Sequence, residues 1–238
     1  MNHFSRRLFG VAAIFAFAVA LTACGDPEPE QRKAFIEFLQ KMVDRQGVHV
    51  MNTLPADEKT FGDYTKHYAV IIDFNQHMKA ISEKSANKMI QMGLDQTKQR
   101  TIEQMVSHRA DIIAASQQIG EMLTAIAQEL TAAQIARAAL KQPDDLKKVY
   151  DAAFDKLVAK PAQAVDKVEG VLLDGTKQSL QLVDYILAHP GKIVVNGSQL
   201  RATDAKVMSE MNDLLKAHNA AGMRLEEARR DMQRVIDG

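Results

Sequence analysis

Two acid–histidine pairs have the spacing of metal ligands. Asp63 and His67, like Asp73 and His77, are four residues apart, so on a helix the two members of a pair lie on one face. Zinc accepts carboxylate and imidazole ligands, but a structural site needs four ligands, and no third one lies close in the sequence. Two alternatives to a metal site fit the same spacing. In one, both side chains of a pair are exposed to solvent; in the other, each carboxylate forms a hydrogen bond with its own histidine. We therefore predict no metal site and no cofactor.

Nucleophilic and phosphate-binding chemistry has no signature in this sequence. Serine, histidine and aspartate all occur, but no serine lies in a nucleophile-elbow motif and no glycine-rich phosphate loop is present. His218 falls within an apolar helical pattern, which favours a packed or register-setting polar residue over a ligand. The 12 methionines are typical of core packing rather than of a copper site. We expect a protein that is not an enzyme.

Charge is balanced and interleaved along the chain. Lysine plus arginine and aspartate plus glutamate both number 30. A surface that binds nucleic acid needs a clustered positive field, so we predict no nucleic-acid partner. Near the C-terminus, four arginines alternate with acids at helical pairing distance, which favours a solvated, ion-paired face over an anion site. The residues are Arg224, Arg229, Arg230 and Arg234, with Glu226, Glu227 and Asp231.

The N-terminus has the pattern of a signal peptide. Residues 1–7 carry Arg6 and Arg7 and no acid, and residues 8–20 form an uncharged apolar run. This run is shorter than the roughly 20 apolar residues that span a bilayer. A positive start followed by a short apolar run predicts secretion. Because Cys24 is the only cysteine, no disulfide within the chain can form.

The apolar run is followed by Leu21, Thr22, Ala23 and Cys24, which resemble the bacterial lipobox. In such a motif the thiol accepts diacylglycerol and the chain is cut before the cysteine. The resemblance implies lipid, palmitate included, on Cys24. Two or three acyl chains anchor a protein almost permanently, whereas one chain is marginal. We expect residues 1–23 to be a lipoprotein signal peptide and residues 24–30 a lipidated tether.

Some features of export stay open at this point. An ordinary signal peptide with a chance cysteine is the alternative to the lipobox, and residues 5–9 also fit a twin-arginine motif, so the Sec and twin-arginine routes both remain. Well-studied lipoproteins with aspartate after the acylated cysteine stay in the inner membrane. Gly25 stands there in this sequence. The resemblance thus implies a periplasm-facing lipoprotein, in the inner leaflet of the outer membrane rather than in the inner membrane.

Apolar residues recur three and four positions apart through most of the body, which predicts helices. We expect these over residues 30–45, from a cap at Thr53 or Asp57 to about 92, over 95–141, from Pro143 onward, from Pro161 to about 189, and over 203–236.

Two of these helices carry heptad seams, from Met105 to Ala133 and from Val207 to Val235. Helices with such seams can pack against each other within one chain, as an antiparallel bundle, or between chains, as an oligomer. The pair Asn196-Gly197 suits a type I′ turn and predicts a hairpin near residues 192–202. The fold class is then all-α: an elongated antiparallel helical bundle with long heptad-patterned helices and one small β-hairpin, in a single domain of residues 31–238.

Several segments of the body resemble one family in order. Residues 31–40, placed just after Cys24, are similar to the opening of the YiaF-like family of proteobacterial lipoproteins, a family of unknown function. Residues 139–142 and 144–146 with Phe154, Pro161 and Ala162 resemble its middle, and residues 184–186 and 196–197 its later part. The resemblance implies a lipoprotein and transfers no catalytic or binding residue.

The leading hypothesis is therefore a non-enzymatic envelope lipoprotein, a helical interaction or structural module attached to a membrane by lipid on Cys24. Its partners would be the membrane, and a second protein or another copy of the chain bound through an exposed helical seam. The alternative is a periplasmic carrier that binds a small ligand or metal inside the bundle, which requires polar groups converging there.

Overall fold

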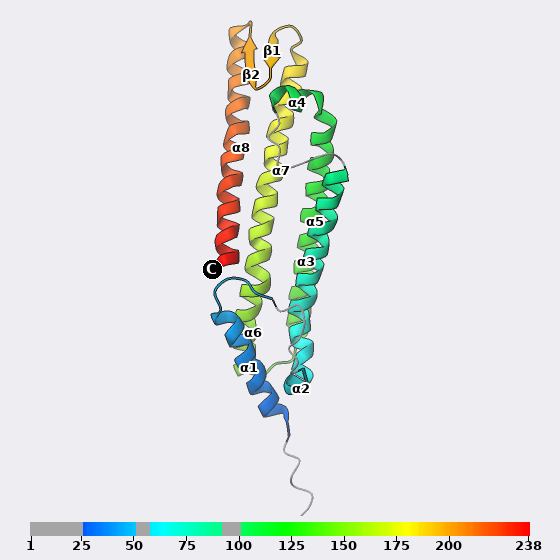
Figure 1. Cartoon of the computed structure of the whole chain (residues 1–238), viewed down its shortest axis with the longest axis vertical. Helices are drawn as coiled ribbons and strands as arrows, with labels where there is room; N and C mark the ends of the chain where they lie inside the picture. Colours follow the sequence, from blue (N-terminus) through cyan, green and yellow to red (C-terminus); the bar gives the residue numbers. More distant parts are fainter. Residues whose placement is uncertain (1–25, 51–57, 92–100) are drawn as a thin grey trace, which may run out of the picture.

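The computed structural model describes residues 26–50, 58–91 and 101–238. It is an elongated bundle of helices with a two-stranded sheet at one end (Figure 1), which confirms the predicted fold class. Leu21, Thr22, Ala23, Cys24 and the proposed caps at Thr53 and Asp57 lie outside these residues, so those assignments stay predictions.

The elements are α1 (Glu28–Asp44), α2 (Glu58–Phe61), a 3₁₀ turn η1 (Gly62–Tyr64), α3 (Thr65–Gln91), α4 (Ile102–Ser107), α5 (Arg109–Ala139), α6 (Asp144–Phe154), a π-helical segment η2 (Asp155–Ala159), α7 (Lys160–Ala188), β1 (Ile193–Asn196), β2 (Gln199–Ala202) and α8 (Ala205–Asp237).

The long helices run along the axis of the molecule, each antiparallel to the next (Figure 1). Helix α7 packs against α5 on one side and α8 on the other, and α3 packs against α5. The two predicted heptad seams, on α5 and α8, do not pack against each other within the chain, because α7 lies between them. Helix α8 has no neighbour as extensive as α7 among the described elements.

The base of the bundle holds the larger hydrophobic core, here called the basal core. Helix α1 crosses this end and packs against α6, so its apolar stripe closes the base. Aromatic rings dominate: Phe35 lies 5.4 Å from Phe61 and 5.8 Å from Tyr64 between ring centroids. Its members are Phe35, Leu39, Met42, Phe61, Tyr64, Tyr68, Ile71, Ile72, Phe74, Ala133, Leu146, Tyr150, Ala153, Phe154, Leu157, Val158 and Ala162.

A smaller hairpin core lies at the opposite end. It comprises Ile102, Met105, Ile112, Leu182, Val183, Ile186 and Met211. The inward face of the hairpin, which includes Val195 and Leu200, packs against it. A two-stranded sheet is marginal in water, and this apolar support stabilises it.

The hairpin is confirmed, with its turn one residue later than predicted. Asn196 pairs with Gln199, so Gly197 and Ser198 occupy the centre of the turn in place of Asn196 and Gly197. Gly197 has φ 62°, and glycine at the first central position is typical of a type II′ turn rather than type I′. The turn is held by Glu103, whose backbone N–H donates to the Gly197 carbonyl and whose carboxylate accepts from the Gly197 N–H, both at 3.0 Å.

The helix predicted over 95–141 is interrupted at His108, so its predicted continuity was wrong. Residues 95–100 of that prediction lie outside the described residues. Thr101 and Gln104 form a capping box, with the Gln104 N–H donating to Thr101 Oγ1 and the Thr101 N–H donating to Gln104 Oε1. This box begins α4. His108 has φ −112° and ψ 32°, outside the helical region, and α5 starts at the next residue.

The separate helix predicted to start at Pro161 is also wrong, because α6 and α7 are joined through η2. Proline has no N–H and leaves the Leu157 carbonyl without its α-helical donor. In η2 the N–H of Lys160 bonds five residues back, to Asp155. Asn75 Nδ2 on α3 donates to the Leu157 carbonyl at 3.3 Å. The π-turn and this side-chain donor together accommodate the proline.

The loop after α1 caps the C-terminal end of α8. The Val48 N–H donates to the Ile236 carbonyl at 2.8 Å, which gives a helix-terminal carbonyl a partner. Gly47 has φ 74°, and a Cβ at this position would lie 2.6 Å from the Ile236 oxygen. Only glycine fits here without strain. This loop ties α8 to the basal core.

Candidate functional site

The two acid–histidine pairs do not form. Asp63 bonds Lys66 at 2.8 Å, and this cation lowers the pKa of the Asp63 carboxyl. His77 Nδ1 lies 2.8 Å from Glu129 Oε2 on α5, while Asp73 is exposed. Across residues 26–50, 58–91 and 101–238, no three histidine, cysteine or acid side chains are placed to hold a metal ion.

His67 belongs to the aromatic wall of the basal core. Its ring lies 5.2 Å from the Tyr64 ring, and its Nδ1 is 3.1 Å from Gln142 Nε2. Because the amide nitrogen can only donate, His67 Nδ1 is the acceptor and the proton is on Nε2. Burial lowers the pKa of His67. The side chain is thus a neutral, packed imidazole.

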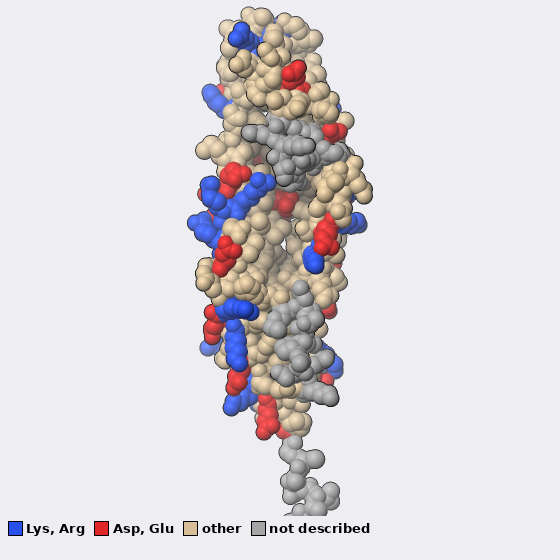
Figure 2. Space-filling view, in the orientation of Figure 1, with Lys and Arg blue, Asp and Glu red and all other residues tan. Residues whose placement is uncertain are grey.

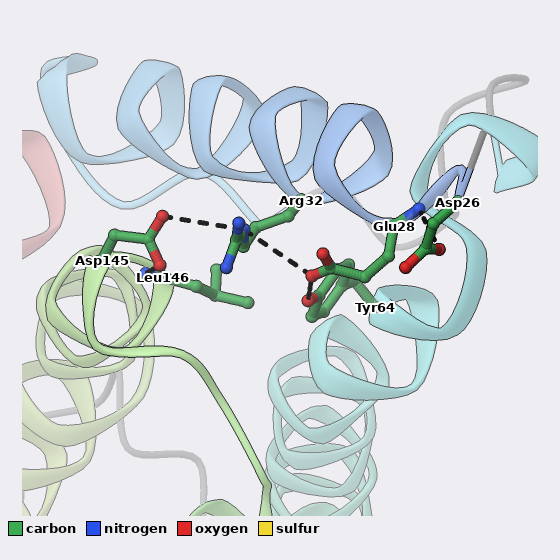
Figure 3. Close-up of polar contacts among 6 residues, drawn as sticks. All are labelled: Asp26, Glu28, Arg32, Tyr64, Asp145 and Leu146. Atoms are coloured by element: carbon green, nitrogen blue, oxygen red, sulfur yellow. Dashed lines mark hydrogen bonds and ion pairs between the residues drawn. The ribbon is translucent and has the colours of Figure 1, made fainter.

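A polar network closes the base of the bundle (Figure 3). The Tyr64 hydroxyl donates to Glu28, and Arg32 Nε lies 3.6 Å from both Glu28 Oε1 and Asp145 Oδ2. Burial and the Glu28 carboxylate raise the pKa of Tyr64 to about 12, so this phenol stays protonated at neutral pH. The network joins α1, η1 and α6.

A groove runs between α7 and α8 in the middle of the molecule. The two helices approach closely where Gly175 faces Ala221, since a Cβ on Gly175 would lie 3.8 Å from the Ala221 Cβ. Beside this contact the groove encloses about 910 Å³, within the range of about 300–1,000 Å³ typical of ligand pockets. Val171, Leu172 and Leu225 contribute apolar side chains to its lining. We refer to it as the α7–α8 groove.

Ser179 and His218 face each other in this groove. The Ser179 hydroxyl donates to the Gly175 carbonyl at 2.9 Å, and its Oγ lies 3.1 Å from His218 Nδ1. With the hydroxyl proton directed at the carbonyl, Oγ accepts from Nδ1–H, which leaves His218 Nε2 as an acceptor. Burial lowers the pKa of His218. The pair links α7 to α8 through a side-chain hydrogen bond.

The arginine-rich part of α8 is only partly ion-paired. Arg224 pairs with Asp174 at 2.5 Å and Arg229 with Glu226 at 3.2 Å, and Arg234 pairs with Asp231. Cations and anions are accordingly intermixed on this side of the molecule (Figure 2). The predicted pairing within the helix is confirmed for Arg229 and Arg234, whereas the partner of Arg224 lies on α7.

Arg230 and Glu227 depart from that pattern. Both are exposed and line the α7–α8 groove, and neither takes part in an ion pair or hydrogen bond with the part of the chain that the structure describes. The sequence had no signal for this, because helical spacing offers Glu226 and Glu227 equally as partners for these arginines. The small residues Gly175 and Ala221, at the close approach of two long helices, were the available clue to the groove.

These features define an all-α, elongated bundle with a hairpin at one end and an open groove along one pair of helices. No helix within the described residues is long and apolar enough to cross a membrane.

The chain belongs to the family described as "Protein of unknown function (DUF3053)", which it matches over residues 12–233. It is 31% identical to "Uncharacterized protein YiaF" of Escherichia coli (strain K12) over 217 residues, which cover 88% of this chain and 87% of the relative. The YiaF proteins of Escherichia coli O157:H7 and Shigella flexneri show the same identity and coverage. No solved structure matches the fold. The predicted family membership is confirmed.

Proposed function

We propose that this protein is an envelope lipoprotein, anchored by lipid on Cys24 and facing the periplasm, whose helical body is a non-enzymatic binding module. The lipobox-like Leu21–Cys24 supports the anchor, and Gly25 favours the inner leaflet of the outer membrane. The family and its relatives carry no functional description that adds to this proposal. The proposal of a non-enzymatic role rests on the engaged Ser179 hydroxyl and the protonated Tyr64 phenol.

The observation that carries the binding role is the uncovered α7–α8 groove. Helix α8 is supported mainly from the α7 side, so part of its apolar seam borders open space instead of a second helix. Met223, at 76% exposure, lies on the groove. A helix of 33 residues that packs mainly against one other helix, α7, presents a surface suited to a further elongated partner.

A cysteine replacement tests the anchor. Cys24→Ser should remove the acyl acceptor, so the protein should leave the membrane fraction or accumulate with residues 1–23 uncleaved. Intact mass spectrometry of the wild-type chain should show acylated Cys24. A processed Cys24→Ser protein that stays in the membrane fraction, or a wild-type chain with a free thiol, contradicts the anchor.

Photo-crosslinking in intact cells tests the groove. A photoreactive residue in place of Met223 should give a discrete adduct with an envelope component. The same residue at Thr131, which is exposed on α5 and outside the groove lining, serves as the matched control. Equal adducts at the two positions, or none at Met223, contradict a binding role for the groove.

A second candidate is a carrier of a small ligand. It is favoured by one observation, the presence of His218 Nε2 and Arg230 in a groove of ligand-pocket size. The site lies between two helices at the surface rather than inside the bundle as the sequence suggested. A thermal-shift screen of small anions and organic ligands tests this, and a His218→Gln protein with an unchanged response would exclude that side chain.

A further inference from the structure

The α7–α8 groove continues into a second groove along the last turns of α8. The second groove encloses about 540 Å³ and is lined by Glu227, Arg230, Asp231, Gln233, Arg234, Asp237 and Gly238. Glu227 and Arg230 line both grooves. They therefore lie where a lining that includes apolar side chains gives way to one made of charged residues, Gln233 and Gly238.

The charges at this junction have no partner in the described protein. Asp231 bonds Lys167 at 2.6 Å and also pairs with Arg234, so its carboxylate is already neutralised. Asp237, the third carboxylate side chain of the second groove, accepts from Gln233 Nε2 at 2.9 Å. At the junction, Arg230 and Glu227 are the cation and the anion without a partner among the described residues, three residues apart and hence one helical turn apart on α8. A ligand that satisfies both needs an anionic group and a cationic group close together, and an apolar part that extends along the first groove.

We propose that the groove binds a zwitterionic phospholipid with a phosphoethanolamine headgroup. Arg230 binds the phosphate, because a guanidinium matches phosphate oxygens in a planar, bidentate geometry. Glu227 accepts hydrogen bonds from the primary ammonium group. One acyl chain lies along Val171, Leu172 and Leu225. This inference rests on the proposed function, since it names the occupant of the same groove.

The headgroup chemistry distinguishes this ligand from its near relatives. Phosphatidylglycerol offers the phosphate to Arg230 but no cation to Glu227. Phosphatidylcholine offers a cation without N–H groups, so Glu227 cannot accept a hydrogen bond from it. A partner helix would cover the apolar lining, but it does not require an unpaired cation and anion at the end of that lining.

Native mass spectrometry of the full-length, membrane-extracted chain tests the proposal. The chain is titrated in detergent with phosphatidylethanolamine, phosphatidylglycerol and phosphatidylcholine of the same acyl composition. We expect phosphatidylethanolamine to bind best. Arg230→Gln should weaken binding of all three lipids about tenfold, the effect of one lost charge-assisted contact. Glu227→Gln should abolish the preference for phosphatidylethanolamine over phosphatidylglycerol and leave phosphatidylglycerol binding unchanged.

Arg229→Gln is the matched control. Arg229 is the adjacent cation, pairs with Glu226, and does not line either groove, so its replacement should leave lipid selectivity unchanged. The two groove variants should unfold at the wild-type temperature, because the replaced side chains have no partner to lose among the described residues.

Two results overturn the inference. One is equal binding of the three lipids by the wild-type chain, and the other is a selectivity that survives Glu227→Gln. If either occurs while Met223 still gives a discrete protein adduct in cells, the groove is a protein-binding surface and the proposed function stands. If the Met223 adduct is also absent, the proposed function fails with it.

Discussion

The basal core and the α7–α8 pair are built from the same kinds of helix but differ in how those helices are covered. At the base, α1, α3 and α6 enclose large aromatic side chains that are fully buried, such as Phe35, Tyr68 and Tyr150. In the middle of α7 and α8, where the groove lies, the contact is made by small residues, with Gly175 against Ala221. Small residues bring two backbones together but bury little apolar area. The comparison indicates that the base supplies stability and the α7–α8 pair supplies an accessible surface.

The largest difference between the two regions should appear in the core. Phe35→Ala removes a side chain with 0% exposure that contacts four other rings, and it should lower the free energy of unfolding by about 3–5 kcal/mol. Met223→Ala, on the groove, should change it by less than about 0.5 kcal/mol. Denaturant unfolding measures both. Equal effects would erase the distinction.

The loop that ties α8 to the base should show a smaller effect. Gly47→Ala places a Cβ 2.6 Å from the Ile236 carbonyl oxygen and forces a side chain into φ 74°, which should cost roughly 1–3 kcal/mol. Gly191→Ala is the control, because Gly191 also has positive φ, 76°, but nothing lies within 4 Å of its added Cβ. If the two variants lose the same stability, the contact with α8 contributes nothing.

The π-turn gives a test of similar or smaller size. Asn75→Ala leaves the Leu157 carbonyl without a donor and should cost about 1–3 kcal/mol. In a Pro161→Ala background the backbone N–H of residue 161 can supply that bond, so Asn75→Ala should cost less there. A double-mutant cycle of denaturation measurements reports this coupling. Additive effects would mean that Asn75 does not substitute for the missing backbone donor.

The smallest expected effect is a pH dependence shared by both regions, which hold one partly buried histidine each. Burial lowers the pKa of His67 and His218 below 6.5, so the unfolded chain binds protons that the folded chain rejects. Stability should therefore fall as pH drops below about 6.5 toward the folded-state values. Thermal unfolding from pH 7.5 to 5 should show a shallower loss in His67→Gln and in His218→Gln. A slope that neither variant changes would refute this assignment.

The sequence predicted the features that depend on local periodicity. It predicted less well the features that depend on a contact between elements distant in the sequence. Helices, their antiparallel order and the hairpin follow from apolar spacing and turn residues. The joined α6–α7 helix was missed because its Pro161 is accommodated by Asn75, a residue distant in sequence. The turn shift at Gly197 depends on Glu103 of α4 in the same way.

The candidate site was predictable only in part. The arginine spacing on α8 predicted ion pairs within the helix, and two formed, Arg229 with Glu226 and Arg234 with Asp231. Arg224 pairs instead with Asp174 of α7, a contact that depends on how the two helices pack. The spacing likewise did not show that Arg230 has no partner among the described residues. The groove itself arises because α7 separates α5 from α8, a packing choice that two equally good heptad seams do not reveal.

On this account, the α7–α8 groove binds a ligand, whereas the basal core stabilises the fold. Hydrogen–deuterium exchange tests this division of roles directly. The membrane-extracted chain is compared before and after removal of non-covalently bound lipid, and again after phosphatidylethanolamine is added back. Exchange should increase on lipid removal, and recover on addition, in residues 171–179 and 218–230, with the basal core unchanged. Unaltered exchange in those two segments, or protection confined to the base, would contradict the account.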